Sequence, residues 1–128
     1  MKLLLDTCAF LWFQAAAEDL SKTARAAILD PANDVYLSAV SAWEIARKFA
    51  AGSLRLDTSP EILIPRLREE SGIESLSLTE ADALMAQKLP RIHKDPFDRM
   101  LIAQALVNGL RIVTSDEAFD AYPVRVLW

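Results

Sequence analysis

The sequence predicts an α/β fold of three layers, in which a central parallel sheet of about five strands lies between two layers of helices. Short apolar segments alternate with longer segments of helical periodicity along the whole chain. This alternation is typical of a parallel sheet that helices cover on both faces. The chain has 128 residues and a hydrophobic content of 52%, which is enough for a core of ordinary size. We therefore expect one folded domain spanning residues 1–128.

Five segments are expected to form the strands of this sheet. The first, LLLD at 3–6, is an apolar run that ends at Asp6. A carboxylate placed next to so apolar a run is costly unless something nearby needs its charge. The other expected strands are VYLS (35–38), IESLSL (73–78), RIVTSD (111–116) and VRVL (124–127).

The first half of the chain contains three expected helices. One follows the first strand and runs through Trp12. The next is SKTARAAILD, which Ser21 caps and which stops before Pro31. The third is AVSAWEIARKFAAG (39–52), whose apolar residues have helical spacing and whose final glycine is a typical C-terminal cap.

Further helices are expected in the second half. The segment 59–72 has helical character, although Pro65 is expected to kink or split it. Thr79 caps the helix TEADALMAQKL. In DPFDRMLIAQALVNG (95–109), Asp95 is the expected N-cap and proline follows at the first helical position. A short helix, EAFDAY, is expected after Asp116.

Composition limits the classes of partner and compartment. The net charge of −4 and the pI near 4.9 exclude a broad positive surface for nucleic acid, so metal ions or a local basic patch would have to attract it. A single cysteine, Cys8, rules out an internal disulfide framework, and together with a single histidine, His93, it provides no thiolate–imidazole cluster for zinc. The opening segment imitates a signal peptide, but a charge at Asp6 is poorly tolerated there. We therefore expect a cytoplasmic protein.

Acidic residues fall where the predicted strands end. Ligands of open parallel sheets bind beyond the carboxyl ends of the strands, and clustered acids need a proton or a cation among them. An all-oxygen ligand set selects Mg²⁺ or Mn²⁺. The acids that can converge there are Asp6, Glu44, Asp95, Asp98 and Asp116.

Four of these acids also have a structural interpretation, which spacing alone leaves open. Glu44 could form a capping box with Ser41, and Asp98 could simply complement the helix dipole. Asp95 and Asp116 could each cap the helix that follows. Hydroxyls at strand ends could support the carboxylates or could only cap; they are Thr7, Thr114 and Ser115.

A basic segment, KLPRIHKDPFDR, surrounds two of the acids. It is either a solvated loop or a cationic rim that holds phosphates beside the metal. His93 has no visible partner there, and we expect it on the surface. The cations of the expected rim are Lys88, Arg91, Lys94 and Arg99.

Four motifs together resemble those of PIN-domain proteins of the VapC toxin family. They are LLLDTCAFLW, LSAVSAWEIARK, DPFDRMLIAQA and IVTSDEAF, and the similarity runs nearly from end to end. The resemblance implies a PIN-like fold and a Mg²⁺- or Mn²⁺-dependent endoribonuclease that acts as the toxin of a type II toxin–antitoxin pair. It also implies an antitoxin protein as partner, and a homodimer or a toxin–antitoxin hetero-oligomer.

The resemblance also assigns roles to residues. Asp6, Asp98 and Asp116 would hold the metal, Glu44 would complete the catalytic centre, and Asp95 would cap or support its helix. The chain departs from the family at Cys8, where relatives often have histidine. It also has Gly-Ser-Leu after the Glu44 helix, where relatives have Gly-Lys-Leu.

Two other functional classes remain open. If the acids only cap helices, the chain could be a non-catalytic module that binds a partner protein. It could instead be a metal-dependent phosphatase on a similar sheet. Such phosphatases typically have a second aspartate two positions after the first, and that position is Cys8 here.

Overall fold

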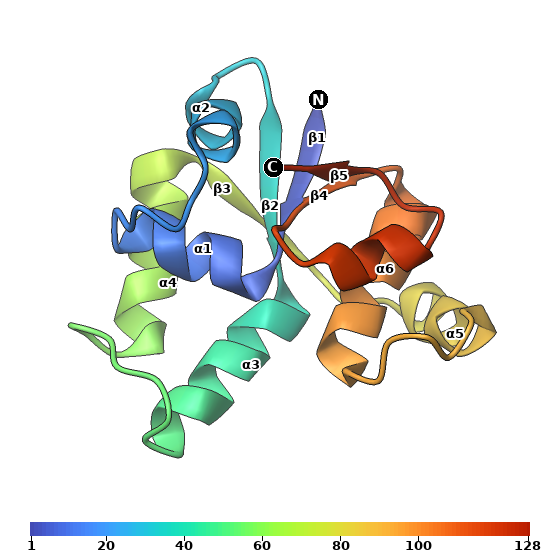
Figure 1. Ribbon diagram of the computed structural model, residues 1–128. Coiled ribbons are helices and arrows are strands. Elements are labelled where there is room, and N and C mark those ends of the chain that lie inside the picture. The colour runs from blue at the N-terminus through green and yellow to red at the C-terminus, as the bar shows by residue number, and fades with distance from the viewer.

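The computed structural model describes residues 1–128 and has at its centre a sheet of five parallel strands in the order β3-β2-β1-β4-β5. The first strand of the chain lies in the middle, and β2 and β4 pair with it on either side (Figure 1). The predicted parallel sheet is therefore confirmed. The strands are β1 Lys2–Leu5, β2 Asp34–Ser38, β3 Ile73–Leu76, β4 Arg111–Val113 and β5 Val126–Leu127.

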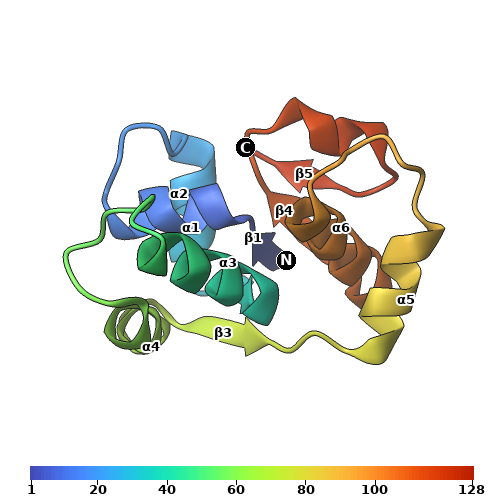
Figure 2. The ribbon, with the colours of Figure 1, turned by 90° about the horizontal axis from the view of Figure 1, so that it is seen from below.

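Helices cover both faces of this sheet, which makes the three predicted layers. Leu3 and Leu5 pack into the core shared with α1, α2 and α4, whereas Leu4 packs into the core beneath α5 and α6. Figure 2 shows these two groups of helices on opposite sides of the strands. None of the helices has the length and apolar character that crossing a bilayer requires. The helices are α1 Thr7–Gln14, α2 Lys22–Leu29, α3 Ala39–Ala50, α4 Pro60–Ser71, α5 Glu80–Lys88 and α6 Pro96–Asn108, and a 3₁₀ helix, η1, covers Glu117–Ala121.

Most of the predicted helix ends are confirmed. The side chains of Ser21 and Thr79 accept hydrogen bonds from backbone amides of α2 and α5, and Thr79 forms a full capping box with Asp82. Asp95 accepts from amides at the start of α6. Gly109 ends that helix with a φ of +66°, in the left-handed region that glycine adopts most easily.

The structure decides two details of the helices that the sequence left open. The N-cap of α3 is Ser38, whose hydroxyl accepts from the Val40 amide, so Ser41 and Glu44 lie inside the helix and form no capping box. Pro65 does not split its helix, because α4 runs unbroken from Pro60 to Ser71.

A buried polar network joins the carboxyl end of β2 to the middle of α6. The Ser38 hydroxyl donates to Gln104 Oε1, and the Gln104 amide donates to Asp82 Oδ2 at 3.3 Å and to the Ser77 carbonyl oxygen at 3.2 Å. Gln104 and Ser38 are 0% exposed. Buried groups paired in this way are costly to separate, so the network fixes α6 relative to the strand from which α3 starts.

Candidate metal centre

Asp6 lies directly after the central strand and is almost fully buried, with 8% of its surface exposed. It is the N-cap of α1, and its Oδ1 accepts a hydrogen bond from the Ala9 amide at 2.7 Å. Burial raises the pKa of the Asp6 carboxyl, although the Thr114 hydroxyl and the Ala9 amide lower it in part. The neighbouring charges of Asp116 and Glu44 raise it further. Asp6 is thus a carboxylate that the fold holds at the sheet edge against its own desolvation cost.

Glu44 comes from the second turn of α3 and is 7% exposed. The Thr7 hydroxyl donates to its Oε1 at 2.6 Å, and Lys48 Nζ lies 2.9 Å from its Oε2. The Ser41 hydroxyl is 3.1 Å from the Thr7 hydroxyl and completes this buried group. Thr7 therefore supports a carboxylate, as one of its two interpretations expects. Lys48 was missed, although its position four residues after Glu44 on the same helix is a signal for such an ion pair.

Asp98 lies in the first turn of α6, where Asp95 caps the helix. Burial raises the pKa of the Asp98 carboxyl to about 6, and the negative charge of Asp95 adds to this, whereas His93 lowers it. The charges of Asp6 and Glu44 raise it as well. The influence of these two acids on Asp98 indicates that carboxylates from β1, α3 and α6 lie within electrostatic reach of one another.

Asp116 follows β4 and has two roles in the structure. Its Oδ1 accepts from the Ala118 amide at 2.9 Å and caps η1. Its Oδ2 lies on the side of His93. We call Asp116 together with Asp6, Glu44 and Asp98 the acidic centre. The Thr114 hydroxyl accepts from the Asp116 amide at 3.0 Å and orients the turn, but Ser115 is exposed. The capping interpretation of Asp116 is therefore confirmed, and its second carboxylate oxygen is free of the cap and available to a ligand.

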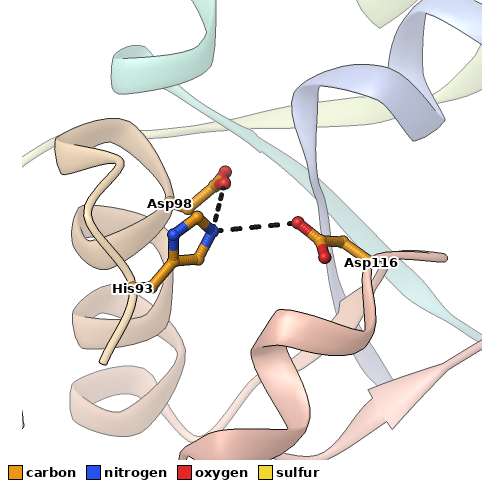
Figure 3. Close-up of side chains that lie close together, drawn as sticks. All are labelled: His93, Asp98 and Asp116. Atoms are coloured by element: carbon orange, nitrogen blue, oxygen red, sulfur yellow. Dashed lines mark ion pairs between the residues drawn. The ribbon is translucent and has the colours of Figure 1, made fainter.

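His93 lies within this centre, so the expectation that it has no partner and lies on the surface is wrong. Its Nε2 is 2.8 Å from Asp98 Oδ2 and 3.7 Å from Asp116 Oδ2 (Figure 3). The ring packs edge-on against Phe119, with 6.0 Å between centroids. A signal in the sequence was its position five residues before Asp98, but Phe119 comes from a distant segment that the local sequence does not reveal.

The cations of the predicted rim lie in three different environments. The Arg99 guanidinium donates to the carbonyl oxygens of Ala86, Leu89 and Pro90, and so holds the end of α5. Arg91 and Lys94 are exposed and line a polar hollow of about 340 Å³ next to His93. Lys94 also lines a second hollow, of about 410 Å³, together with Lys48 and Arg47. Lys88 is exposed and lines neither of these two hollows.

The donor set fits a hard divalent cation. One ring nitrogen of His93 and one carboxylate oxygen each of Asp98 and Asp116 lie within 4.8 Å of one another, and the carboxyls of Asp6 and Asp98 both have a raised pKa. A raised pKa in clustered acids means that the structure lacks positive charge at this point. Carboxylate oxygens supply the ligands that Mg²⁺ and Mn²⁺ prefer.

We expect Asp98→Asn to stabilise the protein when a chelator removes divalent ions. The pKa of Asp98 is about 6 in the folded protein and 3.8 in its ordinary state. At pH values between these two, the folded chain therefore binds more protons than the unfolded chain. Its stability therefore falls as the pH rises from about 4 to about 6, and this loss is complete near pH 7. The side chain is partly exposed, so we expect the substitution to add about 1–2 kcal/mol to the free energy of unfolding at pH 7.5.

Urea unfolding in the presence of a chelator, at pH 5 and at pH 7.5, measures this effect. The variant should gain stability over the wild type at both pH values, and the gain at pH 5 should be about half of the gain at pH 7.5. An equal or larger gain at pH 5 would contradict the raised pKa of Asp98.

Comparison with known proteins gives one family and several similar structures. A family model described as PIN domain matches residues 3–124. Ribonuclease VapC22 of Mycobacterium tuberculosis is 30% identical over 120 residues, which cover 93% of this chain and 90% of that protein.

The similar solved structures have lower sequence identity and show the fold. A chain of the VapBC2 complex of Rickettsia felis, bound to a DNA fragment from its promoter, has a TM-score of 0.71 at 12% identity and covers 98% of this chain and 97% of that one. DNA-bound VapBC from Salmonella typhimurium gives a TM-score of 0.65 at 19% identity, with 98% and 96% covered.

Proposed function

This chain belongs to the PIN domain family, and from this premise we propose that it is a metal-dependent endoribonuclease, the toxin of a type II toxin–antitoxin pair. The observation that carries the proposal is the close approach of Asp98, Asp116 and His93, with Asp6 and Glu44 near enough for their charges to raise the pKa of Asp98. Similarity over nearly the whole length to a protein named as a ribonuclease supports RNA as the substrate.

We assign Asp6, Asp98 and Asp116 as the residues that would hold the ion, with Glu44 completing the site. The chemistry that an ion held by these residues would supply is a lowered pKa of a bound water molecule and compensation of negative charge on the phosphate. The protein's own residues orient the carboxylates: the Ala9 amide holds Asp6, and Thr7 and Lys48 hold Glu44.

The ion itself is proposed to be Mg²⁺, with Mn²⁺ as an alternative. Both take oxygen ligands in an octahedral arrangement, and the carboxylates of the centre satisfy either. We place the activity in the cytoplasm, because a single cysteine, Cys8, fits a reducing compartment.

A protein partner is part of the proposal. Structures similar to this chain include complexes titled VapBC, and we propose that an antitoxin binds this chain as well, with a homodimer or a hetero-oligomer as the assembled form. Trp43 is 62% exposed, and its ring centroid is 5.2 Å from that of Phe97. Both line an apolar hollow of about 450 Å³ next to the start of α6, which offers an antitoxin an apolar surface beside the acidic centre.

We propose that Arg91 and Lys94 bind phosphates of the RNA, with Lys88 as a more distant contact. Arg99 contributes only indirectly, since its guanidinium is committed to three carbonyl oxygens. We expect Arg91→Ala and Lys94→Ala to raise KM several-fold with little change in kcat, because phosphate contacts position the substrate. Each substitution should also reduce the slope of log K against log salt concentration by about 0.7, the value for one phosphate contact to a single strand.

Steady-state cleavage of a short RNA at several salt concentrations measures both effects. Arg66→Ala is the matched control, since Arg66 is exposed on α4, outside both polar hollows. If the control raised KM as much as the two variants do, the rim would have no special part in binding.

Incubation of the purified protein with total cellular RNA and Mn²⁺, followed by mapping of the cut ends, tests the proposed function. We expect cleavage at defined internal positions, and none when a chelator is added. Pure, folded protein that binds no divalent ion and leaves the RNA intact would contradict the proposal and would favour a non-catalytic binding module.

A further inference from the structure

The imidazole of His93 occupies a fixed position between two carboxylates of the acidic centre. Its Nε2 lies 2.8 Å from Asp98 Oδ2, on α6, and 3.7 Å from Asp116 Oδ2, on the segment after β4 (Figure 3). These two acids come from separate parts of the chain, and the His93 ring lies close to both.

The residue is held from several sides. The His93 amide donates to Tyr122 Oη at 2.8 Å, and the Tyr122 hydroxyl donates to the Pro90 carbonyl oxygen at 2.8 Å. The ring lies edge-on against Phe119, which is fully buried. The His93 side chain is only 17% exposed, so the surroundings fix the direction in which the imidazole points.

The hydrogen bond at the other ring nitrogen determines which nitrogen carries the hydrogen. The Asp95 amide donates to His93 Nδ1 at 3.3 Å, so Nδ1 is an acceptor and the hydrogen lies on Nε2. A nitrogen that carries a hydrogen has no lone pair for a metal ion. His93 therefore faces the acids as a donor and not as a ligand.

The Nε2–H group lies near both carboxylates and forms a regular hydrogen bond with neither. Nε2 is completely shielded from solvent and makes no hydrogen bond of regular geometry, although Asp98 Oδ2 is close to it. A polar atom that is buried in this way normally has a partner. An N–H group directed between two acceptors, and not at either one alone, accounts for both facts.

We propose that His93 is a positioning residue, which holds Asp98 and Asp116 facing each other so that they can bind a divalent ion, and which remains an N–H donor when the ion is bound. Without this donor the two carboxylates would repel each other and turn toward solvent. Bringing them together again would then reduce the net free energy of ion binding. The inference rests on the proposed metal centre and adds His93 to its four acids.

The single histidine of the chain allows a direct test by ¹H–¹⁵N nuclear magnetic resonance of the imidazole at constant pH. We expect the hydrogen on Nε2 both in chelator and in saturating Mg²⁺, with a change in the Nε2–H shift when Mg²⁺ binds. A hydrogen that moves to Nδ1 in Mg²⁺ would make His93 a ligand and overturn the proposal. A spectrum that does not respond to bound Mg²⁺ would overturn it as well.

Calorimetric titration of Mg²⁺ into the metal-free protein gives the second measurement. We expect His93→Ala to weaken binding about tenfold, as the loss of supporting groups around metal ligands typically does. His93→Gln should recover most of the affinity, because its amide is also a donor of similar reach. Thermal melting in chelator shows whether each variant is folded.

The outcomes separate this inference from the function on which it rests. If the wild type binds Mg²⁺ and His93→Ala binds it equally well or more tightly, the positioning role is wrong and the metal centre stands. If the folded wild type binds no Mg²⁺, the metal centre fails and the role of His93 fails with it.

Discussion

Asparagine in place of Asp98 or Asp6 will reduce RNA cleavage by at least about a hundred-fold, the loss expected when one key electrostatic group of an active site is removed. Asparagine keeps the shape of aspartate and removes the negative charge that would hold the ion. At position 6 it can also cap α1 as aspartate does, so the helix start is preserved. The rate of cleavage of a defined RNA at saturating Mg²⁺ measures the effect.

Asp19→Asn is the matched control, because Asp19 is an exposed aspartate in the segment between α1 and α2. It should cleave at the wild-type rate, and circular dichroism should show all three variants folded. Cleavage by a folded Asp98→Asn or Asp6→Asn protein at the wild-type rate would mean that the assigned acids do not perform the reaction.

Saturating Mg²⁺ will raise the melting temperature of the protein by on the order of 10 °C relative to chelator. An ion that binds only the folded state adds about 2.7 kcal/mol to the free energy of unfolding when its concentration is one hundred times its Kd. The melting temperature of a domain of this size rises by several degrees for each kcal/mol. The raised pKa of Asp6 and of Asp98 indicates charge repulsion that the ion would relieve. Differential scanning calorimetry in Mg²⁺ and in chelator measures the shift.

Two variants make this measurement specific. Asp98→Asn should lose most of the Mg²⁺-dependent shift while melting higher than the wild type in chelator, and Asp19→Asn should behave as the wild type. Equal melting temperatures of the wild type with and without Mg²⁺ would argue against a preformed site.

Local sequence was sufficient to predict most of the fold. The strand–helix alternation predicted the parallel sheet, because both patterns are set by residues close together in the chain. Caps such as Ser21 and Asp95 were predictable for the same reason. The N-cap of α3 was not, because Ser38 and Ser41 offer the same cap chemistry three residues apart, and the end of β2 decided for Ser38.

The candidate site was predictable where topology alone places a residue. Asp6 and Asp116 follow β1 and β4, and strands that are parallel neighbours end at the same edge of the sheet. His93 and Arg99 could not be assigned in this way. Tyr122 and Phe119 hold His93, and the end of α5 engages Arg99, so their positions depend on tertiary contacts across the fold.

Anomalous diffraction from crystals grown with Mn²⁺ tests most directly whether the acids form a metal centre. We predict one strong peak at the carboxyl edge of the sheet, within coordination distance of Asp98 and Asp116 and on the side that faces Asp6. A peak elsewhere on the molecule, or none at saturating Mn²⁺, would contradict it.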